Sequence, residues 1–168
     1  MRTGHLTVLG SSLLLLAACS AKPQQPVLTF VGVASGTIET PTDGLAFTDR
    51  FPTDITSIIG VAAFEHAEEG TQVMASWFMP DDRRPPFGRR MLTVESGALV
   101  ARFSLAAGGV WEPGPYMLQI HAQTSTGEGE PPLTASGSVR FFVDMTEEEV
   151  ATYLQEYAAW EEARQQSE

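Results

Sequence analysis

The sequence predicts a mainly β protein, an antiparallel β-sandwich of seven or eight short strands followed by a C-terminal amphipathic α-helix. Three observations lead to this prediction. Residues 27–143 are short apolar runs separated by glycine, proline and polar clusters. No helical pattern of crossover length lies between these runs, which disfavours parallel β-α-β units. Helical periodicity begins only after Met145.

Seven strands and a weaker eighth are expected from the apolar runs and the turn residues between them. They cover residues 27–34, 57–65, 71–79, 91–95, 98–105, 115–123 and 138–143, with the weaker one at 45–48. Several of these runs alternate apolar and polar side chains, as expected for a strand with one face in a core. Residues 57–64 are apolar at both parities, so this strand is expected at the centre of a sheet.

Residues 111–116 read Trp-Glu-Pro-Gly-Pro-Tyr and lead directly into a predicted strand. This spacing resembles the W-x-x-G-x-Y entry to a late strand in bacterial immunoglobulin-like and fibronectin-like sandwiches. The resemblance covers about residues 51–143. It implies that Gly114 permits a tight corner, that Tyr116 closes it as a tyrosine corner, and that Trp77 is the core tryptophan. Because the disulfide of antibody domains is absent, only the broad sandwich class is implied, and that class has many functions.

The C-terminal helix is predicted over residues 147–164. Thr146 and Glu149 have the spacing of a capping box, in which each side chain bonds the backbone amide of the other residue. Three glutamates in the first turn also suit the helix dipole. The residues expected to form one apolar stripe recur at helical spacing: Val150, Tyr153, Leu154, Tyr157 and Ala158.

The N-terminal residues indicate export. Arg2 precedes a short apolar run at 6–18, and small residues follow it, as in a secretory signal peptide. Residues 16–19, Leu-Ala-Ala-Cys, resemble the lipobox of bacterial lipoproteins, and Cys19 is the only cysteine. The resemblance implies cleavage before Cys19 and its lipidation, including by palmitate, as a stable membrane anchor. Because Ser20 is not aspartate, the outer membrane is favoured in a Gram-negative source, and the cell surface otherwise.

The predicted organisation is a signal peptide (1–18), a tether (19–26), a β-sandwich (27–144) and an acidic helix (145–168). The net charge is −11, and removal of residues 1–18, whose only charged side chain is Arg2, makes it −12. This charge argues against a nucleic-acid partner, which needs a basic footprint. Nothing in the sequence predicts a cofactor or a bound metal.

No catalytic set of residues emerges from the sequence. His121 lies at a solvent-facing parity of its strand, and His66 lies in a glutamate-rich turn at 65–70. A divalent-ion site there is weaker than the alternative of a solvated turn. An envelope hydrolase or metal-dependent enzyme using His66 or His121 therefore stays an alternative. The favoured expectation is a non-enzymatic binding or structural protein of the cell envelope.

The segment 80–90 is the first predicted binding surface. It holds four of the nine basic residues that follow the signal peptide, stiffened by prolines. Arginine beside an aromatic residue is typical of binding hot spots, here for an envelope protein or an anionic glycan. The alternative is a hairpin whose charges only solvate it. The residues proposed for binding are Arg83, Arg84, Phe87, Arg89 and Arg90.

An apolar outer sheet face is the second predicted surface. Strands bearing Trp77, Tyr116 and Phe141 are expected to be neighbours, which places several apolar side chains on the opposite face. The C-terminal helix is the favoured cover, and the alternative is an accessory subunit whose free helix docks on an envelope complex. The residues concerned are Met74, Phe78, Met117, Phe142, Val150, Leu154 and Tyr157.

Overall fold

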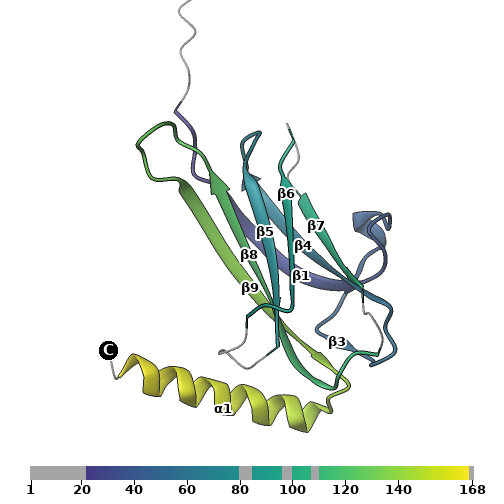
Figure 1. Ribbon diagram of the computed structural model, residues 1–168. Helices are drawn as coiled ribbons and strands as arrows, with labels where there is room; N and C mark the ends of the chain where they lie inside the picture. Colours follow the sequence, from purple (N-terminus) through teal and green to yellow (C-terminus); the bar gives the residue numbers. More distant parts are fainter. Residues whose placement is uncertain (1–21, 80–84, 96–99, 107–109, 167–168) are drawn as a thin grey trace, which may run out of the picture.

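The computed structural model describes residues 22–79, 85–95, 100–106 and 110–166. Two β-sheets pack face to face, and one α-helix runs across one end of them (Figure 1). Cys19, Arg83 and Arg84 lie outside the described residues. The predicted class, mainly β with a C-terminal helix, is therefore confirmed, and the arrangement is that of a sandwich.

The described residues form nine strands, whereas seven or eight were predicted. The elements are β1 (Val27–Ser35), a 3-10 turn η1 (Thr42–Gly44), β2 (Ala46–Phe47), β3 (Arg50–Phe51), β4 (Ser57–His66), β5 (Gln72–Phe78), β6 (Gly88–Thr93), β7 (Val100–Ala106), β8 (Gly114–Thr124), β9 (Leu133–Val143) and α1 (Glu147–Gln165). Strand β9 begins five residues before its predicted start, and β3 was not predicted. A two-residue strand carries no periodicity, so only its pairing reveals it.

One sheet has the order β2-β1-β4-β7 and the other the order β3-β9-β8-β5-β6. The strands bearing Trp77, Tyr116 and Phe141 are neighbours in the second sheet, as predicted. The expectation of wholly antiparallel sheets is wrong at one place, because β3 pairs with β9 in parallel. That pairing is possible because β3 and β9 lie far apart in the chain, so no tight hairpin forces them to run antiparallel.

The core lies between the two sheets. Trp77, Leu118 and Phe141 are fully buried, and Phe103 of the other sheet packs in the same cluster. Trp77 and Phe141 meet edge to face at 6.0 Å between ring centroids. Gly60 of β4 lets the other sheet approach closely, because a Cβ at residue 60 would stand 2.6 Å from Leu118 and 3.1 Å from Trp77. Trp77 is thus the core tryptophan that the sequence predicted.

The outer face of the four-stranded sheet has a second, smaller core. Ile59 and Val61 point away from the main core and are buried with Ala34 and Leu45. The covering loop is held by Arg102 of β7, whose guanidinium donates to the backbone carbonyls of residues 38 and 40. This cover explains why β4 is apolar at both parities, and β4 is a central strand as predicted.

The corner before β8 has the predicted construction. The Tyr116 hydroxyl donates a hydrogen bond to the Glu112 carbonyl at 2.8 Å. Gly114 has a φ of +145°, which side-chain-bearing residues rarely adopt. Trp111 is buried against the ring of Tyr116, with 5.4 Å between the ring centroids. The corner therefore closes through a side-chain hydroxyl, a backbone carbonyl and an edge-to-face pair of aromatic rings.

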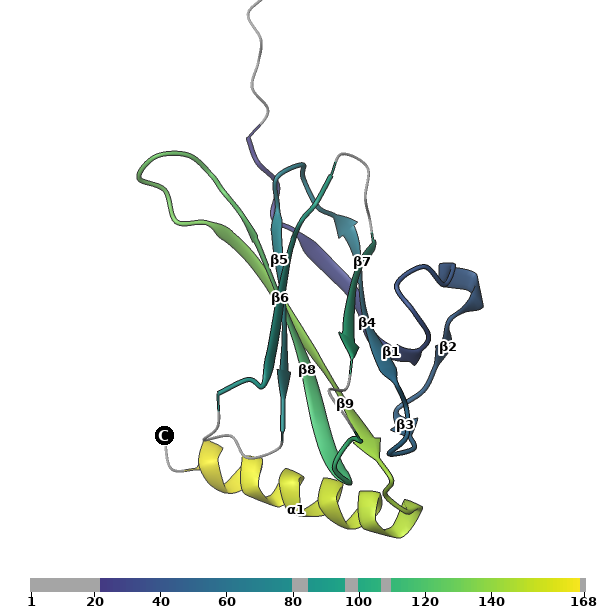
Figure 2. The same cartoon turned by 45° about the vertical axis from the view of Figure 1, so that its right-hand side comes forward.

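Helix α1 begins where it was predicted and ends one residue later. Thr146 and Glu149 form the predicted capping box, with the Thr146 amide 2.7 Å from the Glu149 carboxylate. The helix runs across the end of the five-stranded sheet rather than flat along its face (Figure 2). Its contact with the sandwich is therefore concentrated near its first turns.

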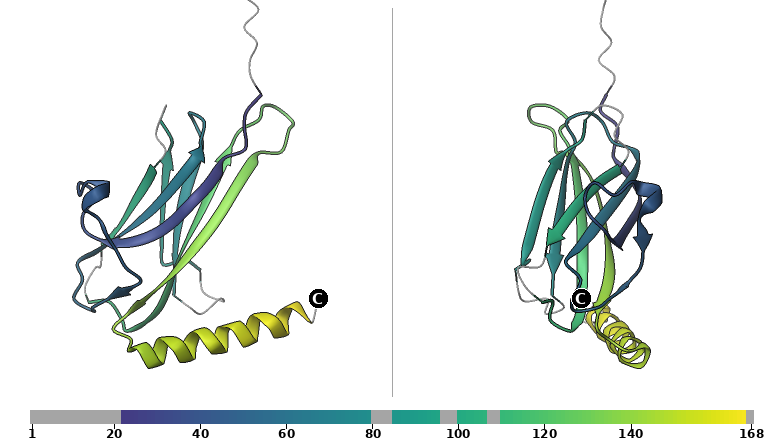
Figure 3. Two further views of the ribbon diagram at one scale, coloured as in Figure 1. Left: turned by 180° about the vertical axis from the view of Figure 1, so that it is seen from behind. Right: turned by 90° about the vertical axis from the view of Figure 1, so that its right-hand side faces the viewer.

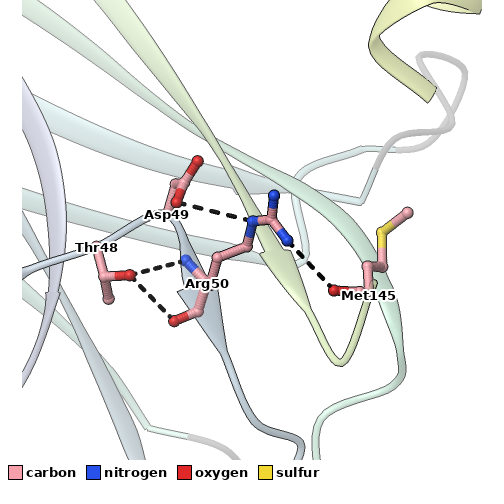
Figure 4. Close-up of polar contacts among 4 residues, drawn as sticks. All are labelled: Thr48, Asp49, Arg50 and Met145. Carbon is pink, nitrogen blue, oxygen red and sulfur yellow. Dashed lines mark hydrogen bonds and ion pairs between the residues drawn. The ribbon is translucent and has the colours of Figure 1, made fainter. Parts of the chain in front are cut away.

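The junction between β9 and α1 is held by Arg50 of β3 (Figure 4). Its guanidinium donates to the Met145 carbonyl at 3.5 Å and lies 5.8 Å from the centre of the Phe142 ring. The Asp49 carboxylate stands 3.9 Å from the same guanidinium. The Asp144 amide donates to Phe51 at 2.8 Å. These contacts link the short parallel strand to the start of the helix.

The docking surface of the helix is narrower than predicted. Val150 is buried, and Tyr153 meets Phe142 edge to face at 6.0 Å between centroids. The Arg140 guanidinium lies 3.7 Å from the centre of the Tyr157 ring. Leu154 is 43% exposed, so its predicted docking is wrong. Because the helix crosses the sheet end, only one edge of the predicted stripe reaches the strands.

The amphipathic character expected of α1 is also wrong. Val150 is its only buried residue, and Trp160 is exposed. Ala151 and Ala159 lie outside the predicted stripe, so apolar residues are spread around the helix. Alanine and tyrosine contribute less hydrophobic contrast than leucine or isoleucine, which is why the spacing overstated the apolar face. Within the described residues, no helix is long and apolar enough to span a membrane.

Candidate functional site

An open pocket lies at the end of the sandwich where β8 begins. It has a volume of about 450 Å³, within the range of roughly 300–1,000 Å³ typical of small-ligand sites. Its walls come from both sheets and from the residues before β8. They are Met79, Phe87, Gly88, Arg90, Leu105, Ala106, Val110, Trp111, Glu112 and Tyr116.

Three aromatic rings form one wall of this pocket. Phe87 lies 6.3 Å from Trp111 and 5.9 Å from Tyr116, measured between ring centroids, and both contacts are edge to face. Tyr116 in turn stacks on Phe141 of the core at 5.3 Å. Phe87 is 47% exposed, whereas Trp111 and Tyr116 are buried. The wall is therefore apolar, and the core behind it keeps it rigid.

The corner before β8 forms the other side of the pocket. The pKa of Tyr116 is raised, first by burial of its hydroxyl and then by the charge of Glu112. The hydroxyl therefore stays protonated and continues to donate to the Glu112 carbonyl at neutral pH. The indole N–H of Trp111 is buried and has no acceptor among the described residues. Trp111 thus contributes an apolar surface rather than a polar contact.

Strand β6 separates the two neighbouring arginines by face. Arg90 pairs with Ala75, a core residue of β5, and therefore lies on the inner face of the sheet, where it lines the pocket. Arg89 pairs with Ser76 and lies on the outer face. Arg90 donates one hydrogen bond to the Arg89 carbonyl at 3.0 Å. It forms no ion pair with a described carboxylate.

The structure thus divides the predicted arginine-rich surface. Phe87 and Arg90 line the pocket, and Arg89 points to the other face of the sheet. Arg83 and Arg84 lie outside the described residues. Sequence reasoning missed Met79, Leu105 and Val110 as pocket residues, and it treated the aromatic corner before β8 as structural only. No sequence signal links these residues, because they meet only when the two sheets pack.

The predicted apolar face does exist on the outer side of the five-stranded sheet. Phe78, Met117 and Arg140 pair in one row across β5, β8 and β9. Met74, Phe78 and Met117 are half-buried, and Phe142 is buried beneath Tyr153. The helix therefore covers the end of this face near Phe142.

Neither histidine takes part in the pocket. His66 is exposed at the end of β4. His121 lies on the outer face of β8, where its Nδ1 is 3.0 Å from the Ser136 hydroxyl on β9. Within the described residues, no carboxylate forms an ion pair or a hydrogen bond with His121 or Ser136. Among the described residues, no group of three metal-ligating side chains lies together.

Comparison with known proteins adds no family to these observations. The chain matches no protein-family model and no curated protein sequence. The class of protein is therefore defined by its fold, a two-sheet β-sandwich with a C-terminal helix.

Proposed function

We propose that this chain is a lipid-anchored, non-enzymatic binding protein of the bacterial cell envelope, built on an immunoglobulin-like sandwich. The observation that carries the binding role is the aromatic pocket with Arg90 at its wall. It joins two residues of the predicted binding segment to the corner before β8. The tyrosine-corner hydrogen bond and the buried Trp77 support the immunoglobulin-like class.

The position of the pocket suits an anchored protein. Gln25 donates a hydrogen bond to the Thr134 carbonyl near the start of β9, whereas the pocket lies at the end of the sandwich where β9 finishes. Figure 3 shows the N-terminal described segment and the helix at opposite ends of the sandwich. An 11-residue strand at roughly 3.3 Å per residue spans about 36 Å. A lipid on Cys19 would thus leave the pocket facing away from the membrane.

The anchor is tested by labelling cells with radioactive palmitate and comparing the full chain with Cys19→Ala. The proposal expects label and membrane association for the full chain and neither for the variant. Membrane association of an unlabelled Cys19→Ala chain would overturn the lipid anchor.

The binding role is tested by affinity enrichment from detergent-solubilised envelopes. Phe87→Ala and Arg90→Ala are compared with Arg89→Ala, which removes the same charge from the opposite face of the same strand. The proposal expects a component retained by the full chain and by Arg89→Ala, and lost from the two pocket variants. Equal retention by all variants, or none by the full chain, would contradict it.

A second candidate function, an envelope hydrolase, rests on the pair formed by His121 and Ser136. A serine nucleophile needs a base within hydrogen-bond reach, and this pair meets that distance. It lies on an open sheet face, and a base is normally oriented by a third group. Labelling with a fluorophosphonate probe decides between the two functions: label lost in Ser136→Ala favours the hydrolase, and absence of label removes it.

A further inference from the structure

We propose that the pocket binds a small apolar molecule carrying a carboxylate, with the apolar body against the aromatic wall and the carboxylate at Arg90. This inference rests on the proposed binding function and names the ligand chemistry of the same site. It starts from one arginine that lines an apolar pocket without an ion-pair partner among the described residues.

Three other arginines among the described residues stabilise the fold. Arg50 bonds a carbonyl at the helix junction, Arg102 holds the loop over the four-stranded sheet, and Arg140 lies against the ring of Tyr157. Arg90 donates one hydrogen bond, to the carbonyl of its neighbour, and within the described residues its other donors have no protein partner. A guanidinium with free donors matches the two oxygens of a carboxylate, which it binds as a charge-assisted pair.

The apolar side chains that line the pocket indicate the chemistry of the rest of the ligand. Phe87, Trp111 and Leu105 offer rings and methyl groups. The buried indole N–H of Trp111 cannot serve an incoming acceptor unless the wall moves. An apolar body gains by leaving water here, at roughly 25 cal/mol for each Å² of surface buried. A fully polar anion would leave this wall unused.

Glu112 sets the orientation of the ligand. Glu112 also lines the pocket, it forms no ion pair with Arg90, and its charge raises the pKa of Tyr116 after the larger effect of burial. The negative charge therefore lies near the Tyr116 corner, and the positive charge lies on β6. An anionic ligand is attracted at one side of the pocket and repelled at the other, so its carboxylate belongs at Arg90.

The experiment uses the three tryptophans as internal reporters. The full chain, labelled with 5-fluorotryptophan and held in neutral lipid nanodiscs, is titrated and followed by ¹⁹F NMR. Trp111 lines the pocket, Trp77 is in the core, and Trp160 is exposed on the helix. The probes are 3-phenylpropionate, its neutral isostere 3-phenylpropionamide, and acetate, which has the charge without the apolar body.

The expected result is a shift of the Trp111 signal alone, with 3-phenylpropionate binding about tenfold more tightly than the amide, and with no acetate binding. Arg90→Met is expected to abolish the preference for the acid, and Glu112→Gln to increase it. Arg89→Met, the matched control on the opposite face, is expected to keep it.

Each other outcome is decisive. Equal binding of the acid and the amide at Trp111 overturns the carboxylate inference but leaves pocket binding intact. Acetate binding as tight as 3-phenylpropionate overturns the apolar requirement. No shift of Trp111 with any probe overturns this inference, whereas the envelope enrichment separately decides the proposed function.

Discussion

The helix junction and the pocket lie at the same end of the sandwich, and they use arginine and phenylalanine in opposite ways. At the junction, Phe142 is 3% exposed beneath the helix and Arg50 binds the Met145 carbonyl. At the pocket, Phe87 is 47% exposed, and the hydrogen bond that Arg90 makes to a described residue goes to the backbone of its neighbour. The same residue types thus close one surface and leave the other open. This contrast separates side chains that maintain the fold from those available to a ligand.

The largest expected effect comes from the two phenylalanines. Phe142→Ala should cost about 3 kcal/mol of unfolding free energy, because it removes a buried ring and its contact with Tyr153. Phe87→Ala should cost about 1 kcal/mol, because its ring is half in water already. Urea denaturation followed by tryptophan fluorescence measures both. Equal losses would mean that the pocket wall is as much a part of the core as the junction is.

Tyr116→Phe should have the next largest effect, since it leaves the Glu112 carbonyl without its donor. The expected loss is about 1 kcal/mol at neutral pH, measured by the same denaturation. Burial, and then the charge of Glu112, raises the folded-state pKa of Tyr116 above its ordinary value of 10.0. The stability that depends on its protonated form is therefore complete below pH 10.0 and is lost as the pH rises through the higher folded value.

The variant should consequently lose less stability than the wild type between neutral and strongly alkaline pH. Tyr157 also has a raised pKa, mainly through burial, so part of the alkaline loss should remain. An identical alkaline loss in both proteins would show that the corner hydroxyl does not govern this dependence.

Substitutions of Arg140 and Arg90 should have smaller effects on stability. Arg140→Met should cost about 0.5–1 kcal/mol, because its guanidinium lies 3.7 Å from the centre of the Tyr157 ring. Arg90→Met should change stability by no more than about 0.5 kcal/mol, since its guanidinium lies over no ring of the described residues. Thermal melts of the two variants, compared with Arg89→Met, check the difference. A greater loss for Arg90→Met would assign that arginine a structural role.

The smallest effect is expected at the helix start. The pKa of Glu149 is lowered by the hydrogen bond from the Thr146 amide and then by that from its hydroxyl. The stabilisation is therefore present above the ordinary value of 4.5 and is lost as the pH falls through the lower folded value. Far-UV circular dichroism should show the helical signal of the wild type falling in that range. Glu149→Gln, which keeps the cap's hydrogen bonding without the charge, should respond less.

The sequence predicted the elements that depend on local patterns. Alternation of apolar and polar residues in 115–123 and 71–79 predicted Trp77 and Tyr116 in the core. The sequence around Gly114 predicted the corner. The capping box gave the first residue of α1. These predictions succeeded because backbone conformation and side-chain parity follow from residues close together in the chain. The two-residue strand β3 was missed, since its pairing with β9 joins residues far apart.

The candidate site was predicted only in part for the same reason. Composition directed attention to Phe87 and Arg90, but it could not separate Arg90 from Arg89. That distinction depends on the register of β6 against β5. Likewise, helical spacing proposed Leu154 for docking, and the angle at which α1 crosses the sheet end left it exposed.

The sequence by itself therefore determined the mainly β class, the core parities, the corner before β8 and the capped helix, because each is a local pattern. It also predicts a lipid anchor at Cys19. Only the tertiary structure decided which arginine faces the pocket, which part of α1 docks and how both sheets contribute to one cavity. Those features depend on register and packing between distant segments, and side-chain spacing along the chain does not encode them directly.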